Sequence, residues 1–195
     1  MRSRLSVTAI GGPVRIVFSY SHRDEGWRDL IERHLNVLAT QRIAEIWSYG
    51  RIGAGEPWER ETLEAFDSAH LAILLISPDF LGSQYIMNIE VPRILDRHRS
   101  GELAVVPVYL RPCLWEAVSW LRKIQMRPRN GVPLSSLRGW KQEAEMARIA
   151  KEIWEILVPP AAKAGQVGAE PPCLPCRGCA ERDDHDLRPG GAKDE

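Results

Sequence analysis

The sequence predicts an α/β fold in which helices cover both faces of a parallel sheet. Short β-rich runs at residues 14–18, 43–47, 71–76 and 103–110 alternate with amphipathic segments. The run at 71–76 is apolar throughout, which is typical of a central parallel strand that is buried on both faces. Strands that alternate with helices in this way fold as right-handed crossovers around one sheet.

The first helix has a clear start signal. Ser21 and Asp24 follow the first predicted strand and form a capping box, with Ser21 as the N-cap residue. Apolar residues then recur at helical spacing, which predicts a helix over about 24–39 with one side facing the core. The second strand, at 43–47, comes directly after this helix.

Glycine and proline mark the loop that follows. Three glycines and Pro57 fall within residues 48–57, so this segment is predicted to be a long loop. Pro57 suits the first turn of the next helix. Further helices are predicted at about 83–98 and 140–157. Helical spacing places three tryptophans on apolar faces and predicts that they pack in the core: Trp27, Trp140 and Trp154.

The composition changes near residue 158. Residues 159–195 are rich in proline, glycine and charge, which is typical of a disordered tail. Residues 1–12 are predicted to be a flexible leader, and they are not expected to be a secretory signal because they lack its sustained apolar core. We therefore expect one folded domain at 13–158, since 195 residues are too few for two domains of ordinary size.

Charge and cysteine content exclude several classes of partner. Lys+Arg and Asp+Glu both number 26, so the chain lacks the basic excess of most proteins that bind nucleic acid. Since no run of about 18 apolar residues occurs, we expect no membrane span. Four cysteines without a disulfide framework favour a cytoplasmic location. Cys173, Cys176 and Cys179 have metal-like spacing but lack a clear fourth ligand, so we expect no metal site.

Familiar ligand-binding motifs of parallel α/β proteins are absent. No Gly-Lys-Ser/Thr sequence follows a strand, and no GxGxxG sequence opens the first helix. A G-x-S-x-G elbow is also missing. Ser19 and Ser77 stand near the strand ends where a phosphoryl-accepting receiver domain needs acidic residues. The function must therefore rest on other residues.

Ligands of such sheets bind beyond the carboxyl ends of the strands. The residues at these ends are Ser19, Tyr20, Trp47 and Ser77. After the third strand, Glu90 lies beside an apolar stripe of its helix, and on its own such an acid is more often the edge of a solvated face. Pro92 lacks the N–H group that would pair with the Asn88 carbonyl, so the helix is expected to loosen one turn from the acid.

Four stretches of the chain carry a resemblance to a known family. They are residues 18–21 (FSYS), the loop between 47 and 58, residues 75–81 (LISPDFL) and residues 85–90. In this order and at these spacings they resemble a TIR (Toll/interleukin-1 receptor) domain of bacterial type, over residues 13–158. The resemblance implies a flavodoxin-like parallel sheet of four to five strands with helices on both faces.

The resemblance also implies a reaction. Many TIR domains hydrolyse NAD+ at the bond between nicotinamide and ribose, using one glutamate on the third helix, and Glu90 is the matching residue. One carboxylate suffices because nicotinamide departs as a neutral molecule, and the acid stabilises the oxocarbenium-like ribose that remains. NAD+ is then the substrate, and no separate cofactor is expected.

Residues around Glu90 are expected to contact the nucleotide. The expected binding residues lie at the carboxyl ends of strands or in and beside the loop: Ser19, Tyr20, Trp47, Arg51, Trp58 and Ser77. Trp47 and Trp58 flank the loop and are candidates for stacking on a base. Arg51 is the candidate for supplying positive charge within the loop.

The loop departs from the bacterial TIR pattern W-x-D-R-x-I. Tyr49 and Gly50 stand where many relatives have Asp and Arg, which favours a non-catalytic module that binds other TIR domains in signal transduction. The retained Glu90 favours an assembly-activated NAD+ glycohydrolase of immunity, such as anti-phage defence. In both cases the expected partners are other TIR domains, bound through the 48–57 loop, and a separate sensor protein.

Overall fold

The computed structural model describes residues 12–47 and 58–158. Nearly all of the predicted leader 1–12, the loop 48–57 and the tail 159–195 lie outside the described residues.

A four-stranded parallel sheet forms the centre of the described fold. Its strands are β1 (Val14–Ser19), β2 (Ala44–Trp47), β3 (Leu71–Ile76) and β4 (Ala104–Tyr109), in the order β2-β1-β3-β4. Every residue of β3 is buried, as its continuous apolar run predicts for a central strand. The predicted α/β class and parallel sheet are confirmed.

A single residue covers the outer edge of β4. The Tyr109 N–H donates to the Arg127 carbonyl, and the Arg127 N–H donates to the Pro107 carbonyl at 2.8 Å. Arg127 thus makes a parallel bridge where a fifth strand would lie. This pairing satisfies backbone groups that an open edge would leave exposed.

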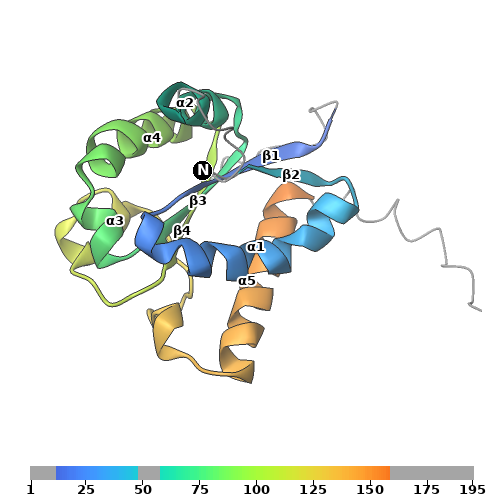
Figure 1. Cartoon of the computed structure of the whole chain (residues 1–195), viewed down its shortest axis with the longest axis vertical. Coiled ribbons are helices and arrows are strands. Elements are labelled where there is room, and N and C mark those ends of the chain that lie inside the picture. The colour runs from blue at the N-terminus through green and yellow to red at the C-terminus, as the bar shows by residue number, and fades with distance from the viewer. Residues whose placement is uncertain (1–11, 48–57, 159–195) are drawn as a thin grey trace, which may run out of the picture.

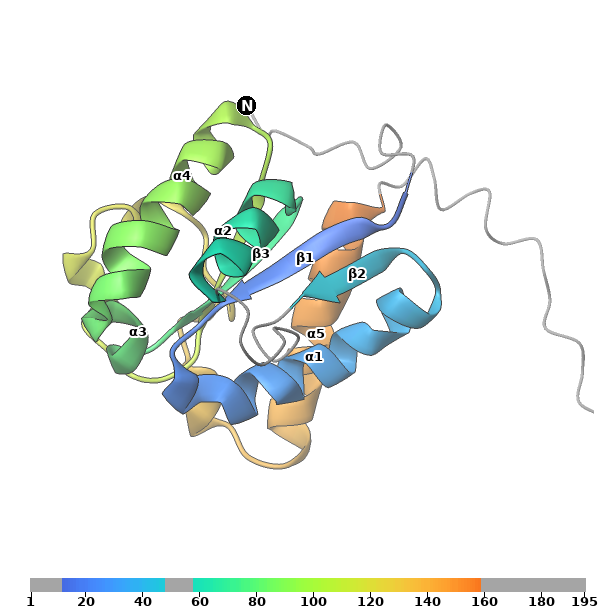
Figure 2. The same cartoon turned by 45° about the horizontal axis from the view of Figure 1, so that its top comes forward.

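Helices cover both faces of the sheet (Figure 1). One face packs against α1 (Glu25–Thr40) and α5 (Trp140–Leu157). The other face packs against α2 (Trp58–Ser68), α3 (Pro78–Gly82) and α4 (Val91–Ser100), as Figure 2 shows from a second direction. Each face has its own apolar core, so the sheet separates two groups of side chains.

The alternation of side chains along β1 decides which group each residue joins. Ile16 and Phe18 belong to the core beneath α1 and α5, and Val17 belongs to the core beneath α2 and α4. Consecutive residues at the end of β1 therefore point to opposite faces. This matters for Ser19 and Tyr20, which the sequence places in one cleft.

The helical segments differ in detail from the predicted ones. The predicted helix at 83–98 corresponds to a π-helical turn at Ile86–Glu90 (the π-turn) followed by α4, and α3 precedes it as a separate short helix. The predicted capping box is wrong. Ser21 makes no side-chain cap hydrogen bond, and the Asp24 carboxylate bonds to Ser77 and Arg111 instead. Short 3-10 turns occupy His22–Asp24, Trp115–Ala117, Leu121–Lys123 and Leu134–Ser136.

The prediction for the helix tryptophans holds for two of the three. Trp27 and Trp154 are partly buried against the core beneath α1 and α5. Trp140 is 75% exposed at the first residue of α5, so its predicted core position is wrong. At a helix end, helical spacing alone does not ensure that a neighbouring element covers the side chain.

Candidate functional site

Glu90 is a buried carboxylate at the carboxyl edge of the sheet. Its exposed fraction is 1%, and that of Ser19 is 0%. The Ser19 hydroxyl, at the end of β1, donates to Glu90 Oε2 at 2.5 Å. Hydrogen bonds to an ionised acceptor are short and strong, so this contact holds the carboxylate in one orientation. The strand end and the helix predicted to carry the acid are thus brought together.

The backbone around Glu90 has π-helical geometry. The Val91 N–H donates to the Ile86 carbonyl five residues earlier, which widens the turn that ends at Glu90. Pro92 follows within α4 and has no N–H group to give the Asn88 carbonyl, so the α-helical pattern is interrupted here. Ile86 and Val91 are buried and fix the turn against the core. Such turns are frequent at functional sites.

Tyr85 lies next to this carboxylate at the start of the π-turn. Burial raises the pKa of the Tyr85 phenol, and the negative charges of Glu90 and Glu59 raise this pKa further. Glu59 is in the first turn of α2, so α2 also approaches the site. At neutral pH the phenol therefore keeps its proton. In the sequence, Tyr85 begins the stretch 85–90 that resembles the TIR family, but no role near the carboxylate was predicted for it.

A second buried carboxylate, Asp24, lies at the same edge of the sheet. Its exposed fraction is 0%. The Ser77 hydroxyl donates to Asp24 Oδ2 at 2.5 Å, and Arg111 Nε donates to Asp24 Oδ1 at 2.8 Å. Ser77 follows β3 and Arg111 follows β4, so Asp24 joins the ends of two strands to the segment after β1. Sequence reasoning assigned Asp24 to a helix cap and missed this role.

Arg111 connects Asp24 to the surface. Its guanidinium also pairs with Asp79 in the first turn of α3, and Asp79 in turn pairs with the exposed Arg23 at 3.2 Å. The hydrogen bond from Arg111 is the main cause that lowers the pKa of Asp79. The same bond raises the pKa of Arg111. Both groups therefore stay charged at neutral pH.

Ser77 and Tyr20 are expected in the nucleotide cleft, but their side chains have internal contacts. The Ser77 hydroxyl, which is fully buried, also accepts a hydrogen bond from the Phe80 N–H at 3.1 Å and caps α3. Tyr20 belongs to the core beneath α1 and α5, with the Arg28 guanidinium 5.4 Å from its ring centroid. The structure therefore brings Ser19 to Glu90 and directs Tyr20 to the opposite face of the sheet.

Of the three remaining residues of the predicted site, the structure describes the side chain of Trp47 but not those of Trp58 and Arg51. Trp47 is partly buried on the Glu90 face of the sheet and lines a cavity of about 240 Å³ with Val17 and Ala65. Trp58 begins α2, but its side chain is outside the described part of the chain. Arg51 is also outside it, so its predicted contact stays a prediction.

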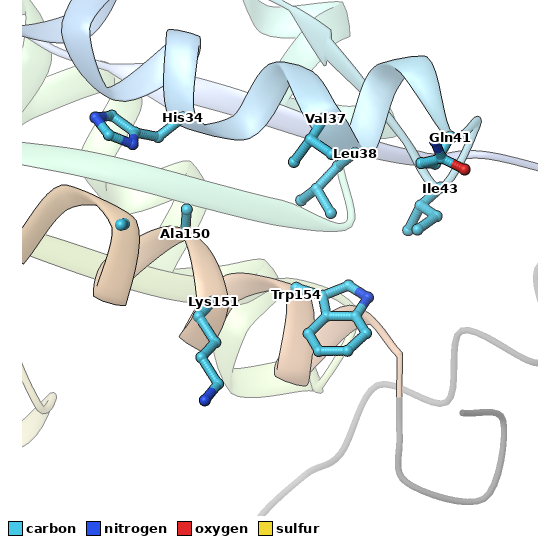
Figure 3. Close-up of a pocket in the computed structure, with 9 residues that line it drawn as sticks. His34, Val37, Leu38, Gln41, Ile43, Ala150, Lys151 and Trp154 are labelled. Atoms are coloured by element: carbon cyan, nitrogen blue, oxygen red, sulfur yellow. The ribbon is translucent and has the colours of Figure 1, made fainter. Parts of the chain in front are cut away.

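A separate groove lies on the far face of the sheet, between α1 and α5. Figure 3 shows Val37 and Leu38 of α1 opposite Trp154 of α5. The groove has a volume of about 680 Å³, and His34 bridges the two helices by pairing with Glu143 at 3.0 Å. Val37 is 58% exposed. Ser19, Tyr20, Trp47 and Ser77, the predicted nucleotide-binding residues whose side chains the structure describes, do not line this groove.

Neither a metal-binding cluster nor a membrane-spanning helix occurs among the described residues. Within residues 12–47 and 58–158, no three His, Cys, Asp or Glu side chains are grouped to hold a metal ion. Cys173, Cys176 and Cys179 lie outside this part. Across the same residues, every helix is too short or too polar to cross a bilayer.

Comparison with a solved structure shows the same fold elsewhere. The TIR domains of the activated Roq1 resistosome, which directly recognises the pathogen effector XopQ, match with a TM-score of 0.50 and 16% identity. That match covers 72% of this chain and 99% of the Roq1 chain. The TIR domain of the Toll-related receptor TRR-2 from Hydra magnipapillata gives a TM-score of 0.49 at 15% identity, covering 73% of this chain and 96% of that one.

Comparison with known sequences identifies the family. The uncharacterized protein y4lF of Sinorhizobium fredii (strain NBRC 101917 / NGR234) is 41% identical over 120 residues. The match covers 62% of this chain and 37% of y4lF, so this chain spans well under half of that relative. A family model described as TIR domain matches residues 16–149, which is more than half of the chain. The chain therefore belongs to the TIR domain family.

Proposed function

We propose that this protein hydrolyses NAD+ at the bond between nicotinamide and ribose, with Glu90 as the catalytic carboxylate. The observation that carries the proposal is the buried Glu90 carboxylate, held by the Ser19 hydroxyl at 2.5 Å at the carboxyl edge of a parallel sheet. Ligands of such sheets bind at this edge. The TIR family includes both NAD+-cleaving effectors and non-catalytic adaptors.

The proposed reaction needs only one acid. The bond between C1′ of the ribose and the pyridinium nitrogen breaks, and its electron pair leaves with nicotinamide, which becomes neutral. Water then bonds to C1′ and releases a proton, so the products are ADP-ribose, nicotinamide and H+. The Glu90 carboxylate stabilises the positive charge that develops on the ribose.

The neighbours of Glu90 have supporting roles in this proposal. The Ser19 hydroxyl donates to Glu90 Oε2 and so fixes the orientation of the carboxylate. The protonated Tyr85 phenol adds no negative charge that would compete with Glu90 for the ribose. A carboxylate that is 1% exposed meets a nucleotide only after surrounding segments move. This burial supports activation by assembly.

The second candidate function is a non-catalytic module that binds other TIR domains. The exposed Val37 in the groove between α1 and α5 favours it, because exposed apolar surface often marks an interaction site. The altered loop residues Tyr49 and Gly50 also favour it. In both functions we infer a cytoplasmic location, with other TIR domains and a sensor protein as partners.

The test measures free nicotinamide after purified protein is incubated with NAD+ at high protein concentration, with and without a crowding agent. Glu90→Gln should abolish release while the circular dichroism spectrum is unchanged. Glu102→Gln is the matched control, since Glu102 is an exposed acid that pairs with Arg97 just after α4. Release that persists in Glu90→Gln excludes Glu90 from the reaction. If the protein self-assembles but releases no nicotinamide under any of these conditions, the adaptor function is correct.

A further inference from the structure

Asp24 is a fully buried carboxylate that the proposed reaction does not use. Both of its oxygens have partners, which are the Ser77 hydroxyl and Arg111 Nε. A buried charge is costly unless it is paired and hydrogen-bonded. Asp24 meets this condition with groups from two other segments of the chain. Its position at the same edge of the sheet as Glu90 suggests a role in shaping that edge.

A continuous series of contacts leads from Asp24 to Glu90. Asp24 accepts from the Ser77 hydroxyl, and the same hydroxyl caps α3 by accepting from the Phe80 N–H. At the end of α3, the Ser83 hydroxyl accepts from the Ile86 N–H at 3.3 Å, and the Ser83 carbonyl accepts from the Met87 N–H at 3.0 Å. These two bonds begin the π-turn that ends at Glu90.

Arg111 strengthens the same connection at the first turn of α3. One end of its guanidinium binds Asp24, and the other pairs with Asp79. Asp24 and Arg111 together therefore hold the beginning of α3 by two routes, a hydroxyl and an ion pair. Because α3 has only five residues, its placement depends on these end contacts.

We propose that Asp24 is a positioning residue for Glu90. Its carboxylate fixes the start of α3 through Ser77 and Arg111, and α3 fixes the π-turn so that the Glu90 carboxylate meets the Ser19 hydroxyl. The effect on catalysis rests on the proposed NAD+ hydrolysis, whereas the effect on the Glu90 carboxylate does not. Asp24 acts through other residues and does not need to touch the substrate.

The test compares Asp24→Asn and Ser77→Ala with a matched control, Glu152→Gln. Glu152 also pairs with two arginines, Arg127 and Arg129, but it lies on α5 on the other face of the sheet. The first readout is the titration midpoint of the Glu90 carboxyl, followed by NMR of the full chain labelled with 13Cδ-glutamate. The Glu90 signal is assigned as the one that Glu90→Gln removes.

We expect Asp24→Asn and Ser77→Ala to move the Glu90 midpoint by more than about 0.5 pH unit, because the carboxylate loses its fixed contact with Ser19. Glu152→Gln should leave it in place. The second readout is nicotinamide release, where kcat should fall about tenfold in both test variants and KM should change less than about twofold, since geometry and not substrate affinity is altered.

The two readouts separate the two proposals. If the wild-type chain releases no nicotinamide, the proposed function fails, and the Glu90 midpoint alone decides the role of Asp24. An unchanged midpoint in folded Ser77→Ala and Asp24→Asn overturns the positioning role. If Asp24→Asn does not fold, Ser77→Ala decides, because it removes one hydroxyl and leaves the ion pair with Arg111 intact. An equal shift in Glu152→Gln also overturns the proposal.

Discussion

The Ser19 hydroxyl donates to Glu90 Oε2 at 2.5 Å, although 71 positions separate the two residues in the chain. This bond joins the end of β1 to the π-turn and orients the carboxylate that we propose to be catalytic. Both side chains are almost fully buried, so water does not replace the bond if it is lost.

Ser19→Ala should therefore lower both stability and activity. Removing the donor leaves a buried carboxylate oxygen without this partner, which costs about 1–3 kcal/mol in the free energy of unfolding. Urea denaturation measures this loss, and nicotinamide release should fall about tenfold, because the carboxylate is no longer oriented. Ser100→Ala is the control, since the exposed Ser100 hydroxyl donates to the Arg97 carbonyl of its own helix. Equal losses in both variants would contradict the prediction.

Pro92→Ala should lower activity without lowering stability. Alanine restores an N–H group that pairs with the Asn88 carbonyl and favours the α-helical pattern over the π-turn. Glu90 then rotates away from Ser19, so nicotinamide release should fall while the urea midpoint stays equal or rises. Pro112→Ala, at an exposed position after β4, is the control. Full activity in Pro92→Ala would show that the π-turn is dispensable.

Arg111→Met should destabilise the fold more than the loss of a surface ion pair does. It leaves the buried Asp24 carboxylate without this cation, which costs about 3 kcal/mol in the free energy of unfolding, the low end for a buried pair because Arg111 is itself 31% exposed. Arg23→Ala removes the other arginine that pairs with Asp79, but Arg23 is 81% exposed, so the expected change is below about 0.5 kcal/mol. Urea denaturation of both variants checks the contrast. Similar midpoints would mean that Asp24 does not need Arg111.

Stability should fall at high pH because of Tyr20. Burial raises the pKa of Tyr20 from 10.0 to about 12, so the folded state keeps the phenol neutral where the unfolded chain ionises. The stabilisation is complete below about pH 10 and is lost as the pH rises to about 12.

The check is the free energy of unfolding between pH 9 and 12, measured for the wild type, Tyr20→Phe and Tyr109→Phe. Tyr20→Phe keeps the ring beside Arg28 but has no proton to lose, so its stability should fall less steeply over this range. Tyr109→Phe should behave as the wild type does. An unchanged slope in Tyr20→Phe contradicts the expected effect of its burial.

Much of the architecture was predictable because it rests on local patterns. The apolar run at Leu71–Ile76 marked the central strand, and helical spacing marked α5 at Trp140–Leu157. Such patterns report which side chains must be buried, and burial is the dominant force in folding. Local spacing failed for Trp140, whose exposure depends on what packs against the end of α5.

The candidate site was predictable only in part. The resemblance to TIR domains indicated Glu90, and the rule for strand ends indicated Ser19. The sequence did not indicate that Ser77 and Asp24 bond to each other, since 53 positions separate them. It also placed Tyr20 beside Ser19, whereas the pleat of β1 sends them to opposite faces of the sheet.

The amino-acid order by itself determined the alternation of strands and helices, the neutral charge and the presence of one acid at the TIR position, because these depend on composition and short spacing. The tertiary structure alone decided that Glu90 is buried against Ser19 and that Asp24 holds the ends of β3 and β4. These contacts join segments that are distant in the chain. Their geometry depends on sheet order and side-chain direction, which no local pattern contains.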